Sequence, residues 1–81
     1  MSRTLTSPLH TNLINFMIRA RKKAGLTQAE VAARLNRYQS FVATVEKGQR
    51  RIDIVELFLF ANAIGFDPVE AIKHLKKNSE C

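Results

Sequence analysis

Apolar residues recur at helical spacing along most of the chain, and polar residues or glycine separate the segments that carry them. Between Thr27 and Gly48 they form two short sets, one on each side of Asn36, a residue type that tolerates left-handed backbone. Thr27 and Glu30 have the spacing of a capping box, and Gly48 follows the second set as a C-terminal cap. Helices of about two turns are not stable alone, so both must pack on the rest of the chain. The predicted pair, joined by a tight turn, covers residues 28–35 and 39–47.

Three further segments show the same spacing, and each begins with a side chain that caps helices. Ser7 and Asp67 each precede a proline, which is favoured in a first turn, and Asp53 opens a second capping box. The predicted helices are residues 8–24, 54–64 and 68–76. No segment alternates as a strand does, so the predicted fold class is all-α, a compact domain of five helices. We place this domain at residues 7–77, between a flexible arm (1–6) and a tail (78–81).

One apolar face of each helix is the predicted core. Its members are Leu9, Leu13, Phe16, Met17, Ala20 and Ala24 in the first helix, Val31, Leu35, Val42 and Val45 in the short pair, and Ile54, Leu57, Ala61 and Ile64 in helix 54–64 with Phe58 and Phe60 beside them. A second stripe, of Val55, Leu59 and Phe66, points well away from the first. A small domain cannot enclose one helix from both sides, so this stripe predicts the interface of a symmetric homodimer. The alternative is that the last helix or the tail folds over it.

The helix pair and the sequence around it resemble the helix-turn-helix of the Cro and phage-repressor family, also called the XRE family. The matching residues are Leu26-Thr27-Gln28-Ala29-Glu30-Val31-Ala32, Gln39-Ser40-Phe41-Val42, Val45-Glu46-Lys47-Gly48, Arg50-Arg51-Ile52-Asp53, Leu57 and the run from Ala61 to Pro68. The likeness covers roughly residues 12–72. Two positions depart from the family pattern, since Asn36 stands where glycine is usual and Tyr38 where a small cap or proline is usual. The resemblance implies a lambda-repressor-like domain that binds DNA.

Charge is concentrated on the same part of the chain. The net charge is +6, yet residues 19–51 alone hold nine basic and two acidic side chains, a net charge of +7. A focused positive charge favours a polyanion, because neutralising phosphates releases their counterions. A solvated basic surface is the alternative, and the helix-turn-helix resemblance favours nucleic acid.

The resemblance also implies which residues meet DNA. In such proteins the second helix of the pair enters the major groove, so residues near its start reach base edges. The candidate base readers are Gln39, Ser40, Ala43, Thr44 and, in the turn, Arg37. The role of Phe41 is left open by the sequence: its side chain can contact a thymine methyl group, or it can pack on Tyr38 or on the first helix of the pair.

Phosphate contacts are expected on both flanks of that helix. The candidates are Gln28, which heads the first helix of the pair, and the basic residues Arg21, Lys47, Arg50 and Arg51. Glu46 is expected to pair within the chain, with Arg21 or another basic residue. Arg3 in the arm is a weaker candidate for a DNA contact.

Other chemistry has little support in the sequence. Two histidines and the single Cys81 make no metal-site spacing, and His10 is expected at the surface. There is no paired carboxylate, nucleophile–base set or phosphate loop, so we expect neither an enzyme nor a cofactor. The chain has no apolar run long enough to span a membrane and no signal pattern at its start, which favours the cytoplasm of a bacterium, of chromosomal or phage origin.

Three functions fit these observations. The first is a sequence-specific transcriptional regulator that acts as a homodimer on a palindromic operator in double-stranded DNA. The second is the antitoxin of a toxin–antitoxin pair, which would bind both DNA and a toxin. The third, an adaptor that binds protein only, is disfavoured by the basic charge around the helix pair.

Overall fold

Five helices make up the part of the chain that the computed structural model describes, residues 7–79. They are α1 (Pro8–Lys23), α2 (Gln28–Leu35), α3 (Gln39–Glu46), α4 (Ile54–Ile64) and α5 (Pro68–Ser79). The predicted all-α class of five helices is confirmed, and each helix begins where the sequence predicts. Arg3 and Cys81 lie outside the described residues.

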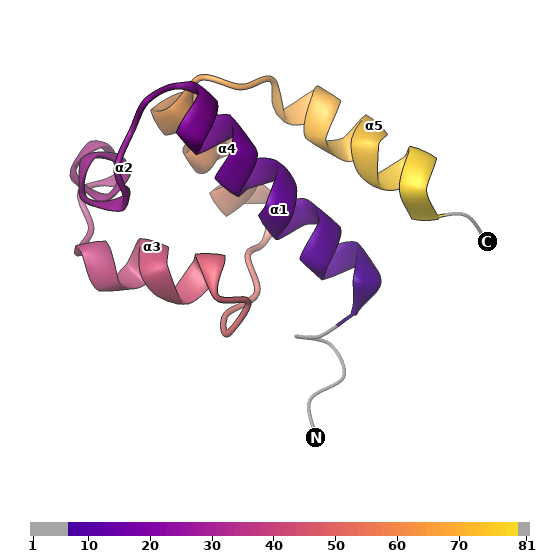
Figure 1. Ribbon diagram of the computed structural model, residues 1–81, viewed down its shortest axis with the longest axis horizontal. Helices are drawn as coiled ribbons and strands as arrows, with labels where there is room; N and C mark the ends of the chain where they lie inside the picture. The colour runs from indigo at the N-terminus through magenta and orange to yellow at the C-terminus, as the bar shows by residue number, and fades with distance from the viewer. Residues whose placement is uncertain (1–6, 80–81) are drawn as a thin grey trace.

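The helices pack around α1. Figure 1 shows α1 running diagonally through the middle of the molecule, with α4 behind it, α5 beside it, and α2 and α3 together on one side. Most of the packing joins α1 to α5 and α2 to α3, and α4 contacts α1, α2 and α5. No helix within residues 7–79 is both long and apolar enough to cross a membrane.

Side-chain caps fix the starts of α1, α2 and α4, as the sequence predicts. Both capping boxes are complete: Thr27 exchanges hydrogen bonds with Glu30, and Asp53 does so with Glu56. α3 begins after Tyr38, whose side chain makes no capping hydrogen bond. The position of α3 therefore depends more on its packing than on a local cap.

The turn between α2 and α3 requires a left-handed residue. Asn36 supplies it, with φ 60° and ψ 44°, and its backbone N–H donates to the carbonyls at the end of α2. Asparagine adopts this conformation at lower cost than most residues with a side chain. It can therefore replace the glycine that is usual here.

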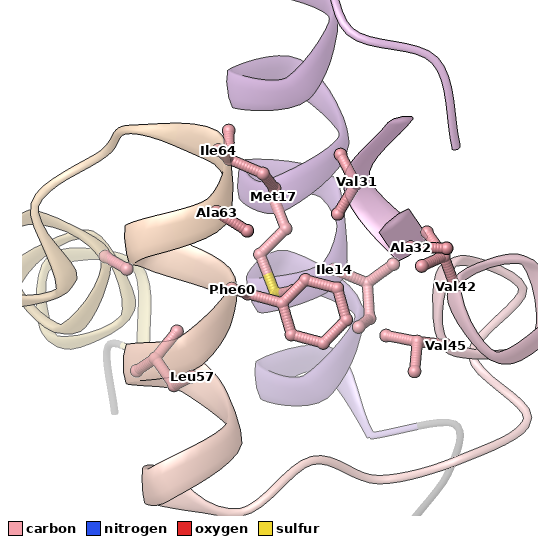
Figure 2. Close-up of a cluster of buried hydrophobic side chains, with 11 residues drawn as sticks. Ile14, Met17, Val31, Ala32, Val42, Val45, Leu57, Phe60, Ala63 and Ile64 are labelled. Carbon is pink, nitrogen blue, oxygen red and sulfur yellow. The ribbon is translucent and has the colours of Figure 1, made fainter. Parts of the chain in front are cut away.

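Apolar side chains from all five helices meet in one core. The most deeply buried large side chains are Phe60, Met17, Val31, Val42 and Val45. Figure 2 shows Phe60 of α4 between Met17 of α1 and the two valines of α3. The predicted core valines are confirmed, and Leu35 is half-buried at the edge of the core. The core thus holds α3 by one face only.

Two predicted core residues of α4 are exposed. The buried face of α4 contains Leu57, Phe60, Ala61, Ala63 and Ile64. Ile54 and Phe58 are instead 57% and 46% exposed. Ile54 lies in the first turn, before the part of α4 that other helices cover, and Phe58 lies on the outward side with Val55 and Leu59. The prediction that both belong to the core is wrong.

The predicted face of α1 is also corrected. Leu9 is 47% exposed and Ala24 is exposed, because they lie at the two ends of the helix, outside the stretch that packs on the core. Ile14, which the predicted stripe omits, is buried in that stretch. A core stripe near the middle of α1 was predictable, but its limits depend on which helices cover it.

His10 is buried, not at the surface as predicted. The residue is 9% exposed, and its Nε2 atom has no hydrogen-bond partner among the described residues. Burial, together with the nearby charge of Arg51, lowers the pKa of the His10 imidazole below its ordinary value of 6.5, although a hydrogen bond to the Arg50 backbone opposes this. His10 lies against the segment between α3 and α4, which is far from it in the sequence, so its burial could not be predicted from the local pattern.

Candidate nucleic-acid interface

The outward face of α3 carries the predicted base readers. Val42 and Val45 are fully buried, which fixes the rotation of this short helix. Gln39 and Ser40 are exposed, and Ala43 and Thr44 follow one turn later, half-buried. Four residues at this spacing lie on one side of a helix. The structure therefore brings the predicted set together on one surface.

The Thr44 hydroxyl makes a hydrogen bond within α3. It donates this bond, of 2.7 Å, to the backbone carbonyl of Ser40. This bond orients the Thr44 side chain, whose hydroxyl oxygen can still accept. Of the predicted readers, Gln39 and Ser40 are the more accessible.

A hydrogen-bonded chain of side chains connects α1, α2 and α3. Arg21 donates to Glu46 through Nε at 2.7 Å and Nη2 at 2.9 Å, and its third bond goes to the Leu26 carbonyl at 2.9 Å. Gln28 donates to Glu46 at 2.9 Å and accepts from Gln39 at 3.3 Å. This hydrogen-bond network thus extends from the buried side of the helix pair to Gln39, a predicted base reader.

This network changes the role of Arg21. The expected pairing of Glu46 with Arg21 is confirmed, and the two side chains are only 9% and 11% exposed. With its guanidinium bonded to Glu46 and Leu26, Arg21 holds α1 to α3 instead of lying on the surface as a phosphate anchor. Gln28, another predicted anchor, is half-buried and orients the Gln39 amide.

Phe41 packs inward on the core, and its main aromatic partner belongs to α4. Its ring stacks on Phe60 of α4, with centroids 5.9 Å apart and planes at 23°. The guanidinium carbons of Arg37 and Arg50 lie 4.1 Å and 4.9 Å from its centroid. A cation over an aromatic face is stabilised by the ring quadrupole. Phe41 therefore joins α3 to α4 and orients two basic side chains.

Arg50 is tied to α4 as well. It makes a two-point ion pair with Glu56, at 3.1 Å and 2.8 Å, while 40% of its side chain stays exposed. The hydrogen bonds from Arg50 lower the pKa of the Glu56 carboxyl, and that carboxylate in turn raises the pKa of Arg50. Glu56 also caps α4 through the Asp53 backbone, so this pair fixes the segment that follows α3.

Exposed cations flank the outward face of α3. Arg37 lies before it, and Lys47 and Arg51 follow it, all with exposed side chains. Tyr38, next to Gln39 and 86% exposed, was missed as a candidate. Its position directly before the second helix was a usable signal, because residues at that helix start are the ones that reach bases.

Within residues 7–79, no cluster of three or more His, Cys, Asp or Glu side chains is placed to hold a metal ion. The polar surface around α3 consists of amides, hydroxyls and cations. This composition suits hydrogen bonding to bases and phosphates.

Comparisons with known proteins agree with this geometry. A family model described as a helix-turn-helix domain matches residues 17–72. A solved XRE-family like protein from Pseudomonas syringae pv. tomato str. DC3000 is 37% identical and superposes with a TM-score of 0.87, over 96% of this chain and 95% of that one. This chain belongs to the XRE family of helix-turn-helix proteins.

One further relative of this XRE-family protein carries a functional name, and a more distant solved structure shares its fold. An uncharacterised HTH-type transcriptional regulator of Sinorhizobium fredii (strain NBRC 101917 / NGR234) is 37% identical over 54 residues, which are 67% of this chain and 70% of the relative. The restriction-modification controller protein C.Esp1396I, solved as a tetramer with its natural 35 base-pair operator, has a TM-score of 0.77 at 22% identity, over 88% of this chain and 93% of that one. The chain is a helix-turn-helix transcriptional regulator.

Proposed function

We propose that this regulator binds a palindromic operator as a homodimer, with α3 of each subunit in the major groove. The observation that carries the proposal is the outward face of α3, where Gln39 and Ser40 are exposed and cations lie at both ends. A groove about 12 Å wide admits one helix, and its base edges offer a donor and acceptor code. Gln39 is the main reader, because its amide can bind adenine through two hydrogen bonds.

The proposed contacts divide by chemistry. Gln39, Ser40, Ala43 and Thr44 face the bases, and Arg37 reaches a guanine or a phosphate from the turn. Lys47 and Arg51 are the main phosphate anchors, since their side chains are exposed. Arg50 and Gln28 contribute at the flanks while they hold α4 and Gln39 in place. Arg21 acts through Glu46, as a positioning residue.

The dimer is proposed to form through α4. Ile54, Val55, Phe58 and Leu59 are 46–63% exposed and lie on one side of the helix, which we name the α4 patch. Phe66 is left out, because it is half-buried and packs edge-to-face on Phe16 at 5.4 Å. A hollow of about 280 Å³ beside Leu59 could receive an apolar side chain of a partner. A two-fold axis here would present two α3 helices to successive grooves, about 34 Å apart.

The relatives favour this function over an antitoxin. One is a controller protein crystallised on its own operator, and the other is named as a transcriptional regulator. The first of these descriptions includes an operator DNA, and the second includes transcriptional regulation. The antitoxin alternative has no comparable support.

Selection of bound DNA sequences, followed by affinity measurements over a range of salt, tests the proposal. The parent should select a palindrome and lose affinity steeply as salt rises. Gln39→Ala should relax preference at one base position, at a cost of about 1–3 kcal/mol, whereas Lys47→Ala should weaken all sequences alike and reduce the salt slope by about one. Lys77→Ala, on α5, is the charge-matched control and should change neither. Identical specificity profiles for Gln39→Ala and Lys47→Ala would refute the division into reader and anchor.

A further inference from the structure

A hollow lies on the side of α1 that faces α5. Its volume is about 620 Å³, within the range of roughly 300–1,000 Å³ that small-molecule sites occupy. The second half of α1, the turn from α4 to α5, and the middle of α5 form its walls. Its lining residues are Phe16, Arg19, Ala20, Lys23, Ala24, Ile64, Gly65, Phe66 and His74.

The hollow has an apolar interior and a basic rim. Phe16 forms its aromatic wall, 5.4 Å from the rings of both Phe66 and His74. Arg19 and Lys23 lie one helical turn apart, and both side chains are exposed. No carboxylate belongs to the lining. An occupant is therefore expected to combine an apolar body with negative charge.

We propose that this hollow binds a small molecule with an aromatic or aliphatic body and one carboxylate group. The apolar body would lie against Phe16 and Phe66. The carboxylate would lie between Arg19 and Lys23, because a guanidinium can bind a carboxylate through two parallel hydrogen bonds. An inorganic phosphate would leave the apolar walls uncovered, and a neutral hydrocarbon would leave the cations unmatched.

The hollow is separate from the proposed DNA surface. Arg21, which contacts Glu46 of α3, projects from a different side of α1 than Arg19 and Lys23 do. Neither α2 nor α3 contributes to the lining. Binding in the hollow therefore does not depend on the proposed function, and it can be measured without DNA.

The test is a titration of the full chain with decanoate, kept below the concentration at which it forms micelles. Backbone amide chemical shifts report the site, and calorimetry reports affinity. We expect the shifts to concentrate at Phe16, Ala20, Gly65 and Phe66. Decyltrimethylammonium, with the same chain and opposite charge, should bind at least about tenfold more weakly.

Variants separate the charge from the apolar interior. Arg19→Gln with Lys23→Gln should reduce decanoate affinity by about tenfold or more, whereas Lys22→Gln, an exposed neighbour outside the lining, should not. Ala20→Leu should also weaken binding, by occupying the hollow. If Ala20→Leu does not fold, the charge variants decide, because their side chains are exposed. Equal binding of both alkyl ions, equal affinity of the double variant and Lys22→Gln, or shifts centred on the α4 patch would each overturn the proposal.

Discussion

α3 and α4 pack on the same core but turn opposite chemistry outward. α3 is anchored by Val42 and Val45, and α4 by Leu57 and Phe60, all nearly fully buried. Outside, α3 presents amides and hydroxyls between cations, whereas α4 presents the α4 patch of four large apolar side chains. The first surface is the one proposed to meet DNA, and the second is the one proposed to meet another subunit. Two helices with similarly buried anchors can thus differ in the chemistry of their exposed side chains, and only that chemistry separates the two proposed roles.

The largest expected effect comes from placing a charge in the core on which both helices pack. Val45→Asp would bury an unpaired charge in a small core, so we expect a loss of more than about 4 kcal/mol and no cooperative folding at 25 °C. Val55→Asp makes the same change at a valine of α4 that is 63% exposed and should leave the monomer folded. Thermal unfolding followed by circular dichroism measures both. An unchanged transition for Val45→Asp would mean that this residue is not in the core.

The next effect sharpens the difference between the two surfaces. Leu59→Glu places a charge in the α4 patch, so the proposed dimer should dissociate into folded monomers and DNA affinity should fall by about 100-fold or more through lost bivalency. Light scattering measures the mass, and gel shifts measure the binding. Val69→Glu, at an apolar residue of α5 that is 48% exposed, is the control. The α4 interface is excluded if the parent is monomeric at tens of micromolar, or if Leu59→Glu stays dimeric.

A smaller effect concerns how α3 is held. Glu46→Gln removes the negative charge to which both Arg21 and Gln28 donate hydrogen bonds. Because the Arg21 and Glu46 side chains are only about one-tenth exposed, the substitution should lower the free energy of unfolding by about 1–3 kcal/mol. Glu70→Gln breaks an exposed pair with Lys73 at 3.9 Å and should cost less than about 0.5 kcal/mol. Urea unfolding compares the two. Equal losses would show that the network does not stabilise α3.

The smallest effect concerns His10 of α1, which lies against the segment that joins α3 to α4. The pKa of His10 is lowered in the folded state, so the unfolded chain binds more protons once the pH falls below 6.5. Stability should therefore be constant above that pH and decline below it, and His10→Leu should flatten this slope. Glu56 and Glu30, whose pKa values are lowered from 4.5, add acid sensitivity only below that value. Urea unfolding at pH 7.5, 6 and 5 measures how the free energy of unfolding depends on pH. If His10→Leu loses as much stability at low pH as the parent does, His10 is not the cause.

The features that the sequence predicts well are local. Capping boxes at Thr27 and Asp53 join residues three apart, and the left-handed Asn36 depends on its own backbone, so helix starts and the turn were predictable. Contacts between distant segments were not. Phe58 and Leu57 are adjacent in sequence, but only the packing of the other helices decides that one is exposed and the other buried.

The same distinction applies to the interface. The outward set on α3 follows from helical spacing and was predictable once the helix pair was recognised. The links of Arg50 to Glu56 and of Gln28 to Gln39 depend on side-chain geometry across helices. These contacts give two expected phosphate anchors a second role, which is to orient their neighbours, and sequence spacing alone carries no signal for that role.

The stack of Phe41 on Phe60 has a consequence for the length of an operator. It joins the helix proposed to read bases to the helix proposed to meet the second subunit, so the two cannot tilt independently. In such a dimer the two α3 helices would be held at one separation and one relative rotation. One extra base pair between half-sites shifts them by about 3.4 Å and turns them by roughly 35°. The number of base pairs between half-sites, and not only their sequence, would then define which sites in a genome this protein recognises.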